Sequence, residues 1–146
     1  MLLVNARCGP SRIHGSGLIA REPIPAGTRI WEFRPGFDVT ISEAEALALS
    51  APSQRQLRFY AYFDLVRRVF VLSSDDDRCT NHSPEPNTRV RGGDHTEAAR
   101  DIAVGEEITC DYRELGWTEF LGVPPGLPLA GPQSAEPLSW HPNFRQ

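Results

Sequence analysis

Prolines and glycines interrupt this chain so often that no long regular element fits between them. The 146 residues include 13 prolines and 12 glycines, and both residue types tend to end helices and strands. Hydrophobic residues make up 40% of the chain and occur in short runs. A chain of this length can bury a core within one domain. The sequence therefore predicts a globular, turn-rich fold built from short elements.

Short strands are expected along most of the chain. The expected strands have the sequences LLVNA, LIA, TRIWEF, RVFVL and EEITCDY, with two more on either side of Gly92 and Gly93. In TRIWEF, Ile30 is followed by Trp31, as in a strand that is buried on both faces. SSDDD is typical of a solvated turn. Because strands do not alternate with helices, we expect a mostly β (α+β) fold with few short helices.

One helix has a clear start signal. Ser42, followed three residues later by Glu45, matches a capping box. Apolar residues then recur at helical spacing at Ala44, Leu47, Ala48 and Ala51. We expect Pro52 to end this helix. The next segment, QRQLRFYAYF, is ambiguous between helix and strand.

The composition changes sharply after Leu121. The segment GVPPGLPLAGPQSAEPLSWHPNF holds six of the 13 prolines, which excludes regular structure and favours an extended tail. We therefore expect a domain over residues 1–121 and a Pro/Gly-rich tail over residues 122–146. Aromatic residues of the tail, among them Trp140, could fold over a site in the domain.

Charge and cysteine content indicate which partners and which cellular compartment to expect. The net charge is -4, so a nucleic-acid partner, which needs a basic surface, is not expected. No apolar run approaches the roughly 18 residues of a membrane span. Cys8, Cys79 and Cys110 are odd in number and share no paired spacing, so we expect free thiols in a soluble, cytoplasmic protein. All 15 basic residues are arginine.

Four short stretches carry residues suited to chemistry, although each has a plain structural explanation when taken alone. HGSGL has two glycines that allow close approach of a ligand, but it is also an ordinary tight turn. NHSPEPN is either a rigid polar contact loop or an asparagine-rich turn. GEEITCDY fits an edge hairpin, and FYAYF fits a core segment.

Taken together and in this order, the four stretches resemble the SET domain, the fold of most protein lysine methyltransferases. HGSGLIAREPIPAGTRIWEF is similar to the opening Gly-x-Gly segment of that family and the strand that follows it. RCTNHSPEPNTR is similar to its Asn-His-Ser segment, and AARDIAVGEEITCDY to its Gly-Glu-Glu and Asp-Tyr segment. The resemblance runs from about Arg12 to Tyr112. The sequence lacks the cysteine-rich segments that bind zinc on either side of many SET domains, so no metal is expected.

The resemblance implies a β-clip fold in which the Asn-His-Ser segment threads beside the Asp-Tyr strand in a knot-like crossing. It implies that S-adenosylmethionine is bound by Asn81 and His82 on one side. The backbone of Gly15, Ser16 and Gly17 would hold it on the other, and Tyr112 would stand at the point of methyl transfer. Trp140 of the tail is a further candidate for contact with the cofactor.

The acceptor implied by the resemblance is a lysine side chain in a basic protein. A lysine amine must lose its proton before it accepts a methyl group, which costs roughly 4 kcal/mol at about pH 7.4. An apolar aromatic channel lowers this cost by desolvation. We expect Tyr60 and Tyr62 to line such a channel, pointing the same way from one strand, although core packing is the alternative for both.

Two positions depart from the family pattern. Pro84 stands where a cysteine is common, and Cys110 replaces an aromatic residue two positions before Tyr112. The smaller side chain of Cys110 would leave room in the pocket, which predicts transfer of more than one methyl group. An acidic surface that includes Asp75 to Asp77, Glu106 and Glu107 is compatible with attraction of a basic substrate.

Two other functions are compatible with these residues. One is a SET-like module that binds cofactor or peptide without turnover, suggested by Pro84 and Cys110. The other is a metal-binding protein that uses Cys79, His82 and Cys110, although a single C-x-x-H pair is weak evidence for a metal. A homodimer that completes the substrate groove is also a possibility that the sequence leaves open.

Overall fold

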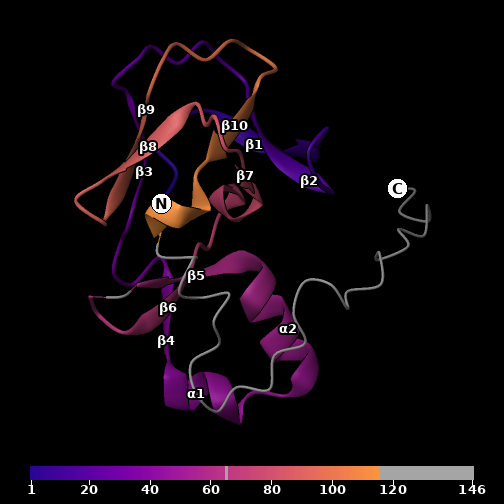
Figure 1. The fold of residues 1–146 in the computed structure, drawn as a ribbon, viewed down its shortest axis with the longest axis vertical. Helices are drawn as coiled ribbons and strands as arrows, with labels where there is room; N and C mark the ends of the chain where they lie inside the picture. The colour runs from indigo at the N-terminus through magenta and orange to yellow at the C-terminus, as the bar shows by residue number, and fades with distance from the viewer. Residues whose placement is uncertain (65, 116–146) are drawn as a thin grey trace.

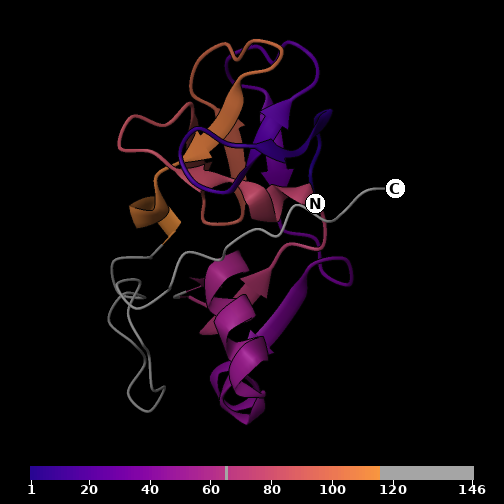
Figure 2. The same cartoon turned by 90° about the vertical axis from the view of Figure 1, so that its right-hand side faces the viewer.

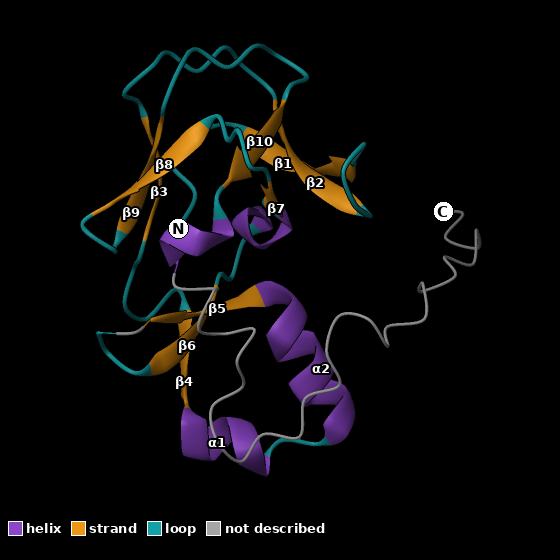
Figure 3. Cartoon of the chain, viewed as in Figure 1, coloured by secondary structure: helices purple, strands orange, loops and turns teal. Residues whose placement is uncertain are grey.

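Residues 1–64 and 66–115 are described by a computed structural model, which shows a mostly β fold with two short helices (Figure 1, Figure 3). The strands form three sheets. The first has the order β1 (Ala6–Pro10), β2 (Ser16–Ala20), β10 (Glu107–Cys110) and β7 (Asn81–His82). The second has the order β3 (Arg29–Glu32), β9 (His95–Ala98) and β8 (Thr88–Arg91), and the third β4 (Val39–Ser42), β6 (Val69–Leu72) and β5 (Ala61–Asp64). The predicted fold class is confirmed, and most expected strands are present.

The two helices stand together beside the third sheet, in the lower part of Figures 1 and 2. Helix α1 (Glu43–Ala48) begins with the predicted capping box, in which the Ser42 side chain accepts from the Glu45 N–H and Glu45 accepts from the Ser42 N–H. The prediction that Pro52 ends a helix is wrong. Pro52 lies in the first turn of helix α2 (Ala51–Tyr60), where its missing N–H has no intrahelical partner to lose. No helix in the described ranges is long and apolar enough to cross a membrane.

Buried apolar residues form two separate clusters. The upper cluster consists of Leu18, Ala20, Ile24, Ile30, Ala98, Ile102 and Ile108. The lower cluster consists of Ala46, Leu57, Ala61, Phe63 and Phe70. Ile30 and Trp31 are both buried, so β3 is covered on both faces as expected. The strand expected at LLVNA is displaced: Leu2 forms only an isolated bridge with Trp31, and β1 begins at Ala6.

A disulfide joins the first sheet to the segment before β7. Cys8 on β1 is bonded to Cys79, the last residue of the 3-10 helix η1 (Asp76–Cys79), with a Cα–Cα distance of 5.9 Å. The prediction of three free thiols is therefore wrong for two of them. The partners are 71 residues apart, so only the folded chain reveals the pair. These two cysteines give no indication of a reducing compartment, whereas Cys110 is a buried free thiol.

Candidate active site

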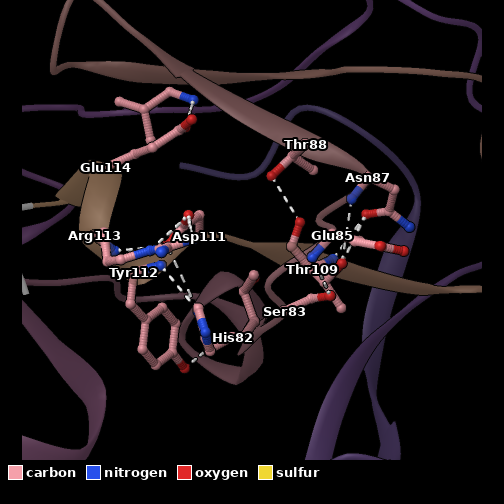
Figure 4. Close-up of polar contacts among 12 residues, drawn as sticks. His82, Ser83, Glu85, Asn87, Thr88, Thr109, Asp111, Tyr112, Arg113 and Glu114 are labelled. Carbon is pink, nitrogen blue, oxygen red and sulfur yellow. Dashed lines mark hydrogen bonds and ion pairs between the residues drawn. The ribbon is translucent and has the colours of Figure 1, made fainter.

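Two segments that are distant in the sequence lie side by side in the first sheet. Strand β7 pairs in parallel with β10, so that Asn81 lies opposite Thr109 and His82 opposite Cys110. The ladder continues where the Ser83 N–H donates to the Cys110 carbonyl at 3.0 Å. The Asn-His pair and the Asp-Tyr pair are therefore neighbours, as the sequence analysis expected. Figure 4 shows His82 beside Asp111 and Tyr112.

Asn81 also reaches the glycine turn that precedes β2. Its side-chain nitrogen lies 2.9 Å from the Ser16 carbonyl, 3.1 Å from the His14 carbonyl, 2.8 Å from a Glu107 carboxylate oxygen and 3.1 Å from the Ser11 hydroxyl. An amide group has only two N–H donors, so four acceptors surround two hydrogens. This corner of the molecule is rich in acceptors and suited to a cationic group.

Position 17 must be a glycine because the Glu107 side chain lies directly over it. A Cβ atom on Gly17 would lie 2.2 Å from Oε1 of Glu107, so any side chain at this position would displace that carboxylate. The Glu107 carboxylate in turn accepts from the Ser11 hydroxyl and from Asn81. Gly15 has a φ of 50°, which glycine adopts without strain. The Gly-x-Gly segment therefore shapes the turn and leaves room for the Glu107 carboxylate.

His82 and Tyr112 pack against each other at the end of β10. The Tyr112 N–H donates to Nδ1 of His82 at 3.2 Å, and the two ring centres are 5.4 Å apart. Asp111 lies 3.8 Å from the same nitrogen, and hydrogen bonds from Arg113 lower the pKa of Asp111 to about 2.

The Tyr112 hydroxyl points to the segment just before Asn81. It donates to the Thr80 carbonyl at 2.8 Å, and the start of the 3-10 helix η2 (Tyr112–Leu115) holds the ring in place. Burial, followed by the charges of Cys110 and Asp77, raises the pKa of Tyr112 above its ordinary value. The phenol therefore stays neutral at physiological pH and can both donate and accept.

A single cavity brings together the residues predicted for the substrate channel. It is lined by Ile30, Trp31, Phe59, Tyr60, Ala61, Tyr62, Ser73, Asp77, Arg78, Thr80, Thr88, Thr96, Ile108, Cys110, Tyr112 and Leu115. Tyr60, Tyr62, Cys110 and Tyr112 are therefore all on its walls. The expectation that Tyr60 and Tyr62 share one strand is wrong, because Tyr60 ends α2 and Tyr62 lies on β5.

The cavity wall is aromatic and uncharged at several points. Burial, with the charges of Asp64 and Asp77 as smaller causes, raises the pKa of Tyr62. Burial likewise raises the pKa of the Cys110 thiol. Both groups are therefore neutral at physiological pH. Trp31 packs edge-to-face against Tyr62, with ring centres 6.0 Å apart, so the wall offers aromatic faces to a cation.

Asn87 is a structural residue of the site that the sequence analysis did not single out. It is 2% exposed, its side-chain oxygen accepts from the Thr109 N–H at 2.8 Å, and its side-chain nitrogen donates to the Glu107 carbonyl at 2.8 Å. Asn87 therefore holds the segment that follows β7 against β10 by hydrogen bonds (Figure 4). A second asparagine six residues after Asn81 was the available signal.

The acidic residues expected to form a steering surface have partners in the fold. Asp75 accepts from the Leu2 N–H, Asp76 from the Cys8 N–H and Asp77 from the Ser73 hydroxyl. SSDDD therefore ends in a 3-10 helix and is not a solvated turn. Glu106 is ion-paired with Arg100 at 2.7 Å, and hydrogen bonding to Arg100 lowers its pKa to about 2. Glu107 belongs to the Asn81 corner.

Two other expectations are affected by the structure. The metal site proposed from Cys79, His82 and Cys110 is excluded in that form, because Cys79 is bonded to Cys8. Trp140 and the rest of the expected tail lie outside the described residues.

The comparisons with known proteins agree with this arrangement. The sequence matches the family model of the SET domain over residues 15–113. The fold is similar to that of a Plasmodium falciparum protein described as a candidate histone methyltransferase, with a TM-score of 0.56, 22% identity, and coverage of 76% of this chain and 95% of that one.

Similar folds also occur in Polycomb Repressive Complex 2 from Chaetomium thermophilum. A humanized mutant bound to the inhibitor GSK126 matches with a TM-score of 0.56 and 21% identity, and an apo form of the complex with a TM-score of 0.58 and 21% identity. Each match covers 77% of this chain and 15% of the other. The family match covers most of the present chain, and the chain therefore belongs to the SET-domain family.

Proposed function

We propose that this SET domain transfers a methyl group from S-adenosylmethionine to the side-chain amine of a lysine in a basic protein. The observation that carries the proposal is the junction of β7 and β10. It sets the acceptor-rich Asn81 corner on one side, and on the other it sets Tyr112 on the wall of an aromatic cavity. Two different ligands can thus approach one point from two sides.

The Asn81 corner fits the amino-acid end of the cofactor. The excess of acceptors around the Asn81 amide suits an ammonium group, and the backbone of residues 15–17 would complete the contact. S-adenosylmethionine supplies a methyl group on a positively charged sulfur. The chain's own residues would fix the orientation of the amine, because Tyr112 is held by both Thr80 and His82, and a fixed alignment lowers the barrier of a displacement.

The aromatic cavity fits an alkyl chain that ends in an amine. Its aromatic faces stabilise a cation at close range, and its neutral phenol at Tyr112 can accept a hydrogen bond from an amine N–H. The small side chain of Cys110 lies on the same wall, which supports the expectation of more than one methyl group per lysine. Strictly monomethylated product in mass spectra would contradict that expectation.

Calorimetric titration with S-adenosylmethionine tests the binding half of the proposal. The wild type should bind, and Asn81→Ala should weaken binding at least tenfold because it removes the amide that organises the corner. Asn5→Ala is a matched control, since Asn5 is exposed and, among residues 1–64 and 66–115, only its backbone forms hydrogen bonds. Equal binding by all three proteins would contradict the assignment of Asn81.

Transfer of label from methyl-tritiated S-adenosylmethionine to basic proteins tests the chemical half. Because the chain contains no lysine side chain of its own, label on any lysine must belong to the substrate. Tyr112→Phe should reduce transfer at least 100-fold with cofactor binding retained. Cofactor binding by the wild type without transfer to any basic protein would favour the alternative of a binding module without turnover.

A further inference from the structure

Asp77 on the cavity wall lacks the cationic partner that the buried carboxylates Asp38 and Asp64 have. Asp38 is paired with the Met1 ammonium at 2.9 Å, and Asp64 is ion-paired with Arg67. Asp77 accepts one hydrogen bond, from the Ser73 hydroxyl at 3.0 Å. Within residues 1–64 and 66–115 it has no ion pair with an arginine. Asp77 is a half-buried residue whose carboxyl group is desolvated, and a desolvated carboxylate without a cationic partner is costly, so its presence here calls for a role.

The same cavity contains two further polar atoms without partners. Trp31, which is 3% exposed, has an indole nitrogen with no hydrogen-bond partner among the described residues, and the same holds for the buried hydroxyl oxygen of Thr80. Both residues line the cavity with Asp77. A plain alkyl group would leave the Trp31 N–H and the Thr80 hydroxyl without partners and the Asp77 carboxylate without a cation. The cavity is therefore suited to a polar occupant that donates hydrogen bonds to Asp77 and Thr80.

Asp77 is electrostatically coupled to the residues that surround this occupant. A negative charge on Asp77 raises the pKa of Tyr62, Cys110 and Tyr112, which lie on three different elements. The Thr80 N–H donates a hydrogen bond to the Asp77 carbonyl, and the Thr80 carbonyl accepts one from the Tyr112 hydroxyl. A cation placed among the aromatic rings would therefore lie within the field of the Asp77 carboxylate.

We infer that Asp77 binds the ammonium group of the incoming lysine in this cavity and then accepts its proton. In that step an N–H bond of the ammonium breaks and its electron pair remains on nitrogen as the lone pair. An O–H bond forms on the Asp77 carboxylate, and two opposite charges become two neutral groups. This inference rests on the proposed function for the identity of the amine, and it adds a residue that recognises the charge of the substrate.

The acidity of Asp77 is compatible with this role. Burial, opposed by the Ser73 hydrogen bond and followed by the charges of Asp75, Met1 and Asp38, raises its pKa to about 7. A group that titrates near neutral pH is a suitable proton acceptor. Desolvation in an apolar cavity disfavours the charged forms of both the amine and the carboxylate, so it favours transfer of the proton that makes both groups neutral.

The test uses n-butylamine as a surrogate for the lysine side chain and needs neither cofactor nor protein substrate. Chemical-shift titrations of the wild type should show butylammonium binding that strengthens as pH rises from 5.5 to 8.5, because binding requires ionised Asp77. Asp77→Asn should weaken binding at least tenfold and remove the pH dependence. The neutral probe 1-butanol should bind both proteins equally.

Asp76→Asn is the matched control. Asp76 belongs to the same 3-10 helix, accepts from the Cys8 N–H and is not on the cavity wall, so its replacement should leave butylammonium binding unchanged. If Asp77→Asn does not fold, the wild-type pH profile and the preference for butylammonium over butanol decide alone. A wild type that binds butylammonium no better than butanol, or an Asp77→Asn variant that binds it equally well, would overturn the inference.

A failure of this inference is distinguishable from a failure of the proposed function. Amine binding without label transfer leaves the Asp77 site intact and removes only the chemistry. Once transfer is measured, Asp77→Asn should lower its rate and shift its pH profile, whereas cofactor affinity, which depends on the separate Asn81 corner, should not change.

Discussion

The two hydrophobic clusters differ in how far apart in the sequence their members lie. The lower cluster is built from residues 46 to 70, whereas the upper cluster joins Leu18 to Ile108. The cavity lies where the two regions meet, since it takes Tyr60 and Tyr62 from the lower region and Ile108 and Cys110 from the upper. A locally folded part thus supplies one wall of the site, and a part that depends on distant contacts supplies the other.

The largest effect should come from removing a large side chain from each cluster in turn. Phe70→Ala should cost about 3–5 kcal/mol and Ile108→Ala about 2–5 kcal/mol of unfolding free energy. Hydrogen exchange should show that Phe70→Ala lowers protection mainly within residues 39–72. Ile108→Ala should lower it throughout the described part of the chain. Identical exchange patterns in the two variants would show that the regions unfold as one unit.

The pH dependence of stability should be dominated by the boundary between the regions, at Asp77. Its pKa is about 7 in the folded chain, whereas the ordinary value for an aspartate side chain, taken here for the unfolded chain, is 3.8. Between these values the folded state holds a proton that the unfolded state has lost, so unfolding free energy should fall as pH rises, by at most about 4 kcal/mol. Urea unfolding from pH 5 to 8 covers about two pH units of this range and should show a loss of about 3 kcal/mol, and Asp77→Asn should remove it.

Other shifted carboxylates do not interfere in that range. The pKa values of Glu106 and Asp111 are lowered to about 2, so their contributions are complete above about pH 5 and are lost only in more acidic solution. A wild type whose stability stays constant from pH 5 to 8 would contradict the prediction for Asp77.

The disulfide should matter most for the upper region, where both of its cysteines lie. Because it closes a long loop from Cys8 to Cys79, reduction should lower the free energy of unfolding by about 2–4 kcal/mol, and exchange of amides in β1 and β7 should increase most. The double variant Cys8→Ser, Cys79→Ser should be insensitive to reductant. If reductant destabilised the double variant to the same extent as the wild type, its action would have another origin.

The smallest expected effect lies in the lower region, at the start of α1. Ser42→Ala removes the side-chain acceptor for the Glu45 N–H and should cost about 1 kcal/mol. The loss should be visible by hydrogen exchange in α1 and undetectable in β2 and β10. An equal loss of protection in both regions would show that they are more tightly coupled than the cluster compositions indicate.

Signals that are complete within a few residues were predictable from the sequence. The capping box at Ser42 and Glu45 was found because both partners are three residues apart. The Gly92–Gly93 turn between β8 and β9 was found for the same reason. Pro52 was misread because a proline is compatible both with the end of one helix and with the first turn of another. Pro52 lies in the first turn of α2.

Features of the site that depend on residues far apart in the sequence were harder to predict. The bond between Cys8 and Cys79 and the contact between Gly17 and Glu107 have no local signature. The motifs predicted that Asn81 and Tyr112 would meet, because the family resemblance carries that information. The family resemblance did not indicate that Asp77 would face the cavity, since a carboxylate in an acidic run is usually solvated.

The parallel pairing of β7 with β10 also limits when the site can form during synthesis. Translation proceeds from the N-terminus, so residues 39–72 can assemble their sheet and helices while β10 has not yet been made. Asn81, in contrast, has no strand to lie against until residues 107–110 have joined the chain. An incomplete polypeptide can therefore form the part of the cavity wall that contains Tyr60 and Tyr62, whereas the Asn81 corner forms only after β10 has been made.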